Sequence, residues 1–324
     1  MTQLTLEPLM FLPILKSRIW GGDKLEKFLN KNAKEDHIGE SWEISDVEGD
    51  VSIVTDGPFR GMSLSDLVEQ YKDEFLGRHN FERFGSKFPL LIKFIDAKTD
   101  LSIQLHPNDE LAFSRHNSFG KNEMWYIMQA DEQAKIIVDF NQPMNAVVYQ
   151  QHLEDGTLPS VMNYEQVSPG DAFMIDVGRV HAIGGGVMLA EIQQTSDVTY
   201  RLFDWNRLDD SGRPRELHTD LALEAINFEL PKNFKRGYDK SFNASNPIVE
   251  CPYFSCNYLE INEKIEIINK FDSFLIYICI EGDLTVNFNN NKWNLVQGQT
   301  LLIPAAVAGF EFETSYAKLL EVYV

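Results

Sequence analysis

Short runs of β-branched and aromatic residues recur along most of this chain, and they constrain its fold more than any other feature. Such runs are typical of strands, and Gly, Asn, Asp or Pro separates many of them. Helical periodicity is confined to residues 63–75, where Ser63 is a candidate N-cap, and to residues 217–228. Many short strands with a few short helices predict a mostly β protein, built as a sandwich or barrel. The clearest strand-like runs span residues 41–45, 89–97, 101–106, 123–129, 134–140 and 274–280.

A weak internal repeat predicts two barrels rather than one. Residues 123–127 align with residues 274–278, and residues 170–181 align with residues 298–309. Self-similarity of this kind indicates that one structural unit is used twice in the chain.

The polar segment 235–247 lies between the two copies and indicates a connector. We therefore expect a domain boundary near residue 240. The first domain would span residues 1–240, including an N-terminal extension, and the second would span residues 241–324.

Composition narrows the classes of partner and compartment. The net charge of −20 disfavours non-specific binding to nucleic acid or to an anionic membrane. An anionic small substrate remains possible, but it would need a local cluster of Lys and Arg. The three cysteines form no CxxC pair, and no stretch approaches the length of about 20 apolar residues that a membrane helix needs. We expect a cytoplasmic protein, and its oligomeric state stays open.

Gln104 and His106 form the first candidate site. Residues i and i+2 of a strand point to the same face, so an amide oxygen and a ring nitrogen could converge on one point. Pro107 would end the strand and place the pair at its rim. A Gln-x-His pair by itself is more often a buried histidine beside an unrelated glutamine.

Several longer motifs carry a family resemblance. Residues 170–181 follow the pattern GD-x4-[P/D]-x-G-x2-H and resemble the second signature stretch of the cupin superfamily. Taken together and in order, the motifs resemble type I mannose-6-phosphate isomerases, in the short bacterial form that lacks a large helical insertion. The other motifs are IWGG at 19–22, IGESWE at 38–43, LSIQLHPND at 101–109, GKNEMWY at 120–126, and EIQQTSD at 191–197 followed by Arg201.

The resemblance implies a fold of two cupin barrels and a metal site in the first. Its four ligands would be Gln104, His106, Glu123 and His181. Two imidazoles and a carboxylate without a thiolate suit a catalytic Zn²⁺ that keeps a position open for substrate. The same donors would accept Co²⁺, Mn²⁺ or Fe²⁺.

The second barrel would hold no metal. In the repeat alignment Phe274 stands opposite Glu123, and Gly309 stands opposite His181. Neither an apolar ring nor a glycine can coordinate an ion, so we expect one zinc ion per chain.

The implied activity is the interconversion of mannose 6-phosphate and fructose 6-phosphate through an enediolate. A base must move a proton between C2 and C1, and Lys121, Glu191 and Lys93 are the candidates. Arg201 resembles the family's active-site arginine, and its planar fork suits a phosphate or polarised sugar oxygens. Val198 stands where the family typically has Asn.

Two other functions fit the same residues. One is a non-catalytic cupin that binds a sugar phosphate, and the other is an isomerase or epimerase of another sugar phosphate. We expect Trp125, Tyr126 and Phe140 to be barrel core, and Trp20 and Trp42 are candidates for the mouth of the site. The histidines outside the ligand set have no partner at ligand spacing, and we give no function to His37, His79, His116, His152 and His218.

Overall fold

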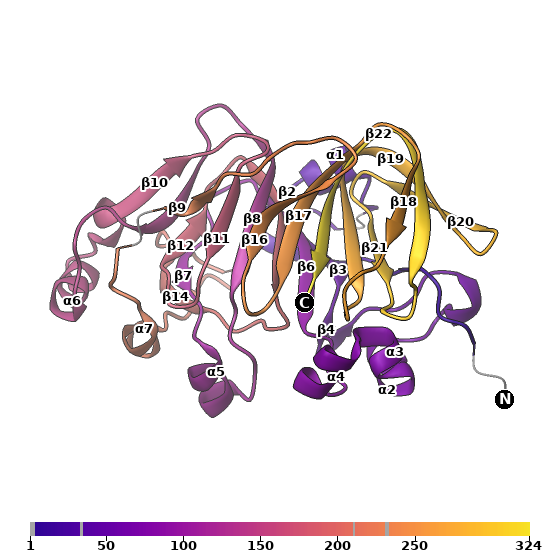
Figure 1. The fold of residues 1–324 in the computed structure, drawn as a ribbon. Helices are drawn as coiled ribbons and strands as arrows, with labels where there is room; N and C mark the ends of the chain where they lie inside the picture. The colour runs from indigo at the N-terminus through magenta and orange to yellow at the C-terminus, as the bar shows by residue number, and fades with distance from the viewer. Residues whose placement is uncertain (1–3, 33–34, 210, 231–232) are drawn as a thin grey trace.

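Two β barrels, packed side by side, make up most of the molecule (Figure 1). The computed structural model describes residues 4–32, 35–209, 211–230 and 233–324. The first barrel forms the left half of Figure 1, and the C-terminal strands, drawn in orange and yellow, form the right half. The sequence-based prediction of a mostly β protein with two barrels is therefore confirmed.

The first barrel is built from two antiparallel sheets that face each other. In order across the seven-stranded sheet, the strands are β15 (Lys235–Arg236), β11 (Ala172–Ile175), β8 (Glu123–Ala130), β13 (Val187–Gln194), β6 (Leu90–Ala97), β2 (Ile14–Gly22) and β3 (Ile38–Ile44). In order across the five-stranded sheet, they are β10 (Met162–Gln166), β9 (Lys135–Phe140), β12 (His181–Ile183), β7 (Ile103–Leu105) and β14 (Tyr200–Phe203). The strands predicted between residues 41 and 140 all lie in these two sheets.

The second barrel is formed by one curved sheet of eight strands. Its strands are β1 (Leu9–Met10), β16 (Ser245–Glu250), β17 (Ser255–Ile261), β18 (Ile265–Ile268), β19 (Leu275–Phe288), β20 (Asn291–Val296), β21 (Thr300–Ile303) and β22 (Gly309–Tyr323). Strand β1 comes from the N-terminal segment and pairs with β21, so the chain contributes to this barrel from both ends. A small hairpin of β4 (Asp46–Val47) and β5 (Asp50–Val51) lies outside the three large sheets. We keep the boundary near residue 240 as a proposal.

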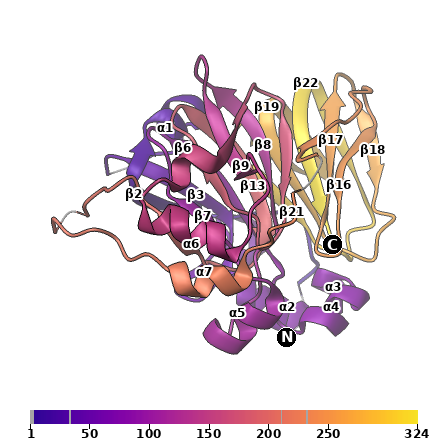
Figure 2. The same cartoon turned by 90° about the vertical axis from the view of Figure 1, so that its left-hand side faces the viewer.

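The helices are short and lie at the periphery (Figures 1 and 2). In the predicted helix at 63–75, Ser63 is the N-cap and its Oγ accepts the Asp66 N–H at 3.1 Å. Lys72, with φ of 50°, divides that helix in two, and the helix predicted at 217–228 is limited to α7. The helices are α1 (Lys24–Leu29), α2 (Leu64–Tyr71), α3 (Asp73–Leu76), α4 (Arg78–Phe84), α5 (Asp109–His116), α6 (Ala146–Glu154), α7 (Thr219–Ala225) and the 3-10 turns η1 (Gly57–Phe59) and η2 (Leu158–Val161).

Successive side chains along a strand point to opposite faces of the sheet, so one set packs inside the barrel and the other packs against its outer face. On β8, Trp125 and Ile127 face the interior of the first barrel, whereas Met124 and Tyr126 face the second barrel. The core between the barrels is continuous, and the Phe88 and Phe274 rings meet there at 4.7 Å between centroids. Helices α6 and α7 cover the outer face of the five-stranded sheet (Figure 2). Because both sheets of the first barrel are backed by packed side chains, their inner faces can hold polar groups in fixed positions.

The repeat alignment is one residue out of register with the strand pairing. Glu123 pairs with Ile175 in the first barrel, and the position equivalent to Ile175 is Ile303. Ile303 pairs with Leu275, so Leu275 rather than Phe274 stands at the place of Glu123. Leu275 faces the interior of the second barrel, and Phe274 faces the first barrel.

We predict that the second barrel binds no metal ion. An apolar Leu275 and a Gly309 without a side chain supply no donor at the two positions that matter. A map of anomalous scattering from zinc-loaded crystals should show one ion per chain, in the first barrel. A second ion between residues 274 and 309 would contradict this prediction.

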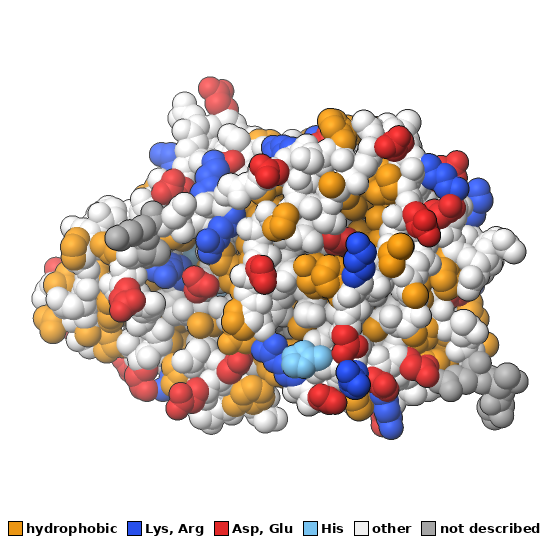
Figure 3. Space-filling model, viewed as in Figure 1, with side chains coloured by type: hydrophobic (Ala, Val, Ile, Leu, Met, Phe, Trp, Pro, Cys, Tyr) orange, Lys and Arg blue, Asp and Glu red, His pale blue; other side chains and the backbone are white. Residues whose placement is uncertain are grey.

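Charged side chains of both signs are interspersed over the face drawn in Figure 3. Among the helices that the structure describes, none has the length and apolar character that crossing a membrane requires.

Candidate functional site

A row of three polar side chains crosses the inner face of the five-stranded sheet. Gln104 on β7 pairs directly with His181 on β12 and with Arg201 on β14. Their strand neighbours, such as Leu105 and Leu202, point the other way into the core beneath α6 and α7. The strand periodicity therefore brings these three side chains to one face of one sheet.

A second row crosses the facing seven-stranded sheet. Lys93 on β6 pairs with Trp42 on β3 and with Glu191 on β13, and Glu191 pairs in turn with Trp125 on β8. The indole N–H of Trp125 donates to Glu191 Oε2 at 2.9 Å, and the Lys93 ammonium lies 4.9 Å from the centre of the Trp42 ring. Two charged groups are thus held between two aromatic side chains.

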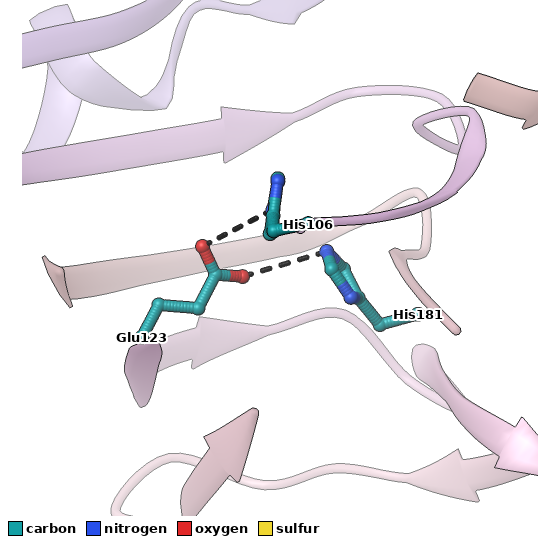
Figure 4. Close-up of side chains that lie close together, drawn as sticks. All are labelled: His106, Glu123 and His181. Atoms are coloured by element: carbon teal, nitrogen blue, oxygen red, sulfur yellow. Dashed lines mark ion pairs between the residues drawn. The ribbon is translucent and has the colours of Figure 1, made fainter. Parts of the chain in front are cut away.

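His106, Glu123 and His181 converge where the two rows approach each other (Figure 4). Glu123 reaches both imidazoles: its Oε2 lies 3.5 Å from His106 Nε2, and its Oε1 lies 3.5 Å from His181 Nε2. Each of these three side chains is about 1% exposed. Three donor atoms therefore meet in a site that water reaches poorly.

Backbone carbonyls fix the orientation of both imidazole rings. His106 Nδ1 lies 2.8 Å from the Val198 carbonyl, and His181 Nδ1 lies 2.9 Å from the Arg179 carbonyl. A carbonyl only accepts, so each Nδ1 carries the proton and each Nε2 turns a lone pair toward Glu123. Because the Val198 backbone makes this bond, the replacement of the family's usual Asn by Val leaves it in place.

Burial keeps both rings neutral. It lowers the pKa of His181 to about 4, with the Lys121 ammonium adding to the effect, and it lowers the pKa of His106 well below the usual range. Neutral imidazole is the form that binds a metal.

The three donors fit a metal ion. A tetrahedral site with bonds of about 2.0–2.1 Å has neighbouring ligand atoms roughly 3.3 Å apart, close to the 3.5 Å that separates a Glu123 oxygen from each imidazole nitrogen. Glu123 Oε1 and His181 Nε2 are both buried and have no hydrogen-bond partner, although they face each other. The Lys121 ammonium already lies against the other two donors, 2.6 Å from Glu123 Oε2 and 3.2 Å from His106 Nε2. Glu123 Oε1 and His181 Nε2 thus face each other with unpaired lone pairs, and the other two donor atoms already bind an ammonium group. This arrangement is that of a cation-binding site.

Gln104, the fourth predicted ligand, pairs with His181 in the same row of the sheet. Its Oε1 accepts a hydrogen bond from Ser102 Oγ at 3.1 Å. The structure therefore brings the proposed ligand to the site with its amide oxygen bound elsewhere, and its role as a ligand stays a prediction.

The three candidate bases form one buried network beside the cluster. Glu191 Oε1 lies 3.4 Å from Lys93 Nζ and 3.7 Å from Lys121 Nζ. Although burial opposes ionisation, the two ammonium groups lower the pKa of Glu191. Burial also opposes the charge of Lys121, but Glu123 and Glu191 outweigh it and raise the pKa of Lys121. Glu191 is therefore an ionised carboxylate and Lys121 a stable cation.

A cavity of about 390 Å³ opens beside this network. Five cationic side chains and three carboxylates line it, in a protein whose net charge is strongly negative. An anionic substrate would meet a locally positive surface there. A protein with a negative net charge needs such a local cluster of Lys and Arg to bind an anion. The cations are Arg18, Lys93, Lys121, Arg201 and Arg215, and the carboxylates are Glu40, Glu191 and Asp197.

Arg201 lines the cavity, and one nitrogen of its guanidinium group has no hydrogen-bond partner. Its Nη1 donates to the Glu216 carbonyl at 2.8 Å, while its buried Nε has no hydrogen-bond partner. Burial and the nearby Arg215 lower the pKa of Arg201. Such a cation is poised to bind an anion.

Two of the five cations that line the cavity, Arg18 and Arg215, were not predicted from the sequence. Arg215 is held by Asp204, and Arg18 makes a two-point contact with Glu40 at 3.0 and 3.1 Å. Arg18 directly precedes the motif at 19–22, which was the available signal, whereas nothing near Arg215 indicated a site.

The aromatic predictions need one correction. Trp125 is buried core, as expected, but it also lines the cavity and holds Glu191. Trp20 lines the cavity, and Trp42 stacks on Lys93 rather than lining the mouth. His218, to which we gave no function, accepts the backbone N–H of Arg201 at 3.1 Å.

Two family models match this chain. Residues 9–150 match a family model described as the catalytic domain of phosphomannose isomerase type I, and residues 245–324 match one described as the cupin domain of mannose-6-phosphate isomerase. The chain is 34% identical to mannose-6-phosphate isomerase ManA of Bacillus subtilis, over 97% of this chain and 98% of that protein.

Solved structures give the same result for the fold. The crystal structure of mannose 6-phosphate isomerase from Bacillus subtilis superposes with a TM-score of 0.89 at 30% identity, covering 98% of this chain and 99% of that one. A mannose 6-phosphate isomerase bound with zinc and yttrium superposes with a TM-score of 0.78 at 18% identity, covering 98% and 99%. On the extent of the sequence match and the shared fold, this chain belongs to the type I mannose-6-phosphate isomerase family.

Proposed function

We propose that this protein is a zinc-dependent aldose–ketose isomerase that interconverts mannose 6-phosphate and fructose 6-phosphate. The observation that carries the proposal is a buried His–Glu–His cluster whose member His181 lines the same cationic cavity as the ionised Glu191. The first group suits a metal, the second suits a base, and the lining suits a phosphate ester.

In this proposal Gln104, His106, Glu123 and His181 hold the metal. Two imidazoles and a carboxylate are donors that zinc accepts, and the fold relative named above as bound with zinc supports that choice. Bound there, zinc would supply Lewis acidity that stabilises negative charge on the sugar oxygens. Gln104 would turn its amide oxygen away from Ser102 to join the set.

Glu191 is the base that we assign for the proton transfer. It is ionised, it lines the cavity, and its Oε1 has no hydrogen-bond partner while Trp125 holds its Oε2. The carboxylate would take the proton from C2 of mannose 6-phosphate and return it to C1 of the enediolate on the same face. Lys93 Nζ and Lys121 Nζ lie 3.4 and 3.7 Å from Glu191 Oε1, so we assign these two side chains to stabilising the negative charge of that intermediate.

Arg201 and Arg215 line the cavity and are the cations that we assign to binding the sugar phosphate. Arg201 lies in the row of the metal ligands, which favours contact with sugar oxygens near the reacting carbons. Asp204 forms ion pairs with both Arg215 and Arg207. Two arginines on one aspartate leave net positive charge for a phosphate group.

An assay of purified, metal-loaded protein with mannose 6-phosphate tests the proposal. We expect formation of fructose 6-phosphate that is lost after chelation and restored by added zinc. If the protein turned over a different sugar phosphate and not mannose 6-phosphate, it would be an isomerase or epimerase of that other substrate. Binding of mannose 6-phosphate without turnover would instead indicate a non-catalytic cupin.

The proposed partner is a small sugar phosphate, and we propose a cytoplasmic location. Cys251, Cys256 and Cys279 are free thiols in the structure, which suits a reducing compartment.

A further inference from the structure

The backbone segment that ends at His181 is held from outside the metal site. The Arg179 carbonyl accepts the His181 Nδ1 proton and so sets the direction of the ring toward Glu123 (Figure 4). Any movement of that carbonyl would turn the ring. The question is therefore what holds residues 179–181 in place.

Asp139 on β9 grips this segment at two points. Its carboxylate forms an ion pair with the Arg179 guanidinium, and its backbone N–H donates to the Val180 carbonyl at 2.6 Å. Arg179 also donates to the Glu229 carbonyl at 3.1 Å. The Val180–His181 peptide and the Arg179 side chain are thus both tied to β9.

The ion pair is buried and its backbone is unusual. Asp139 is 1% exposed and Arg179 is 6% exposed, and removing one partner of such a pair leaves an uncompensated buried charge. Asp139 has φ of 68°, a left-handed conformation that Asp and Asn tolerate better than other residues with side chains. Uncommon backbone conformations of this kind cluster where a structure must hold a functional group.

We propose that the Asp139–Arg179 pair is a positioning device for the metal site, acting through the Arg179 carbonyl on the ring of His181. Neither side chain lines the substrate cavity, and the contact that links the pair to the metal site is the bond from His181 Nδ1 to the Arg179 carbonyl. The inference rests on the proposed metal-binding role of His181. Outer partners that orient a metal-binding histidine typically change metal affinity by about 10–100-fold when they are lost.

A double-mutant cycle on metal affinity tests the pair. D139N keeps the shape and tolerates the left-handed backbone but removes the charge, and R179M removes the guanidinium. We expect each to weaken zinc binding about tenfold, measured by competition with a chelator, and to alter the visible spectrum of the cobalt-loaded protein. The double variant should lose no more than either single one, because both remove the same interaction.

The Lys31–Glu43 pair supplies the matched control. It is equally buried, with Lys31 6% and Glu43 4% exposed, and the ammonium lies 2.7 Å from the carboxylate. E43Q should lower the midpoint of urea unfolding as D139N does, but leave zinc affinity within twofold of wild type.

The outcomes separate two failures. Zinc affinity within twofold of wild type in D139N and R179M would overturn the positioning role, and so would an equal loss in E43Q. Wild-type protein that takes up no zinc would instead overturn the metal site, and the positioning role with it.

Discussion

His181→Ala and His106→Ala should each abolish zinc binding and reduce isomerase activity by about 10³-fold or more. Each imidazole supplies one of the three converging metal ligands, and we expect the two ligands that remain to be too few to hold the ion. The Lewis acidity of a bound metal contributes several kcal/mol to such a reaction, and about 4 kcal/mol corresponds to roughly 10³-fold in rate. Elemental analysis of the purified variants and steady-state kinetics are the measurements.

Loss of metal must be separated from loss of fold. His181 begins β12 and His106 directly follows β7, and both strands are paired in the five-stranded sheet, so we expect the circular dichroism spectrum of each variant to match that of the wild type. His79→Ala, at an exposed histidine on α4, is the control and should keep both metal and activity. Stoichiometric zinc in either ligand variant would contradict the assignment.

Strand parity predicted that Gln104 and His106 share a face, whereas Glu123 and His181 were added to the ligand set by the family resemblance. The spacing of Gln104 and His106 placed both on one face, and the pairing of Gln104 with His181 follows once the strands align. Spacing within one strand does not fix the register between strands, because that depends on the pairing of whole sheets. This is why Phe274 was aligned with Glu123 when Leu275 occupies its place.

Contacts between distant segments could not be read from local pattern. The bond from Trp125 to Glu191 depends on the pairing of β8 with β13, and Arg215 reaches the cavity from a loop after β14. The left-handed backbone at Asp139 has no signature in a strand-like run. Each of these features is set by tertiary packing rather than by local propensity.

The choice among the three candidate bases also required the structure. The sequence did not choose among Lys93, Lys121 and Glu191, but the distances between them explain the charge states of Lys121 and Glu191. Two ammonium groups near one carboxylate hold that carboxylate ionised, and two carboxylates near Lys121 hold it protonated. The network therefore favours Glu191 as the proton acceptor.

Arg201→Ala should lower kcat/KM by on the order of 10²–10³, the effect of removing one donor to a developing oxyanion. If Arg201 only held the phosphate in the ground state, its loss would raise KM and spare kcat. If it also stabilised the enediolate, kcat would fall as well. Its place beside Gln104, in the row that ends at His181, favours the second case.

The kinetics should be measured on zinc-loaded protein, because Arg201 is not a proposed ligand and metal content should stay unchanged. Arg236→Ala, at an exposed arginine of β15, is the control and removes the same charge away from the cavity. Salt screens long-range attraction beyond about 8–10 Å, so a loss that persists at physiological ionic strength reports a close contact. A decrease below about threefold would exclude Arg201 from the reacting end, and the anion-binding role would pass to Lys121 and Arg215.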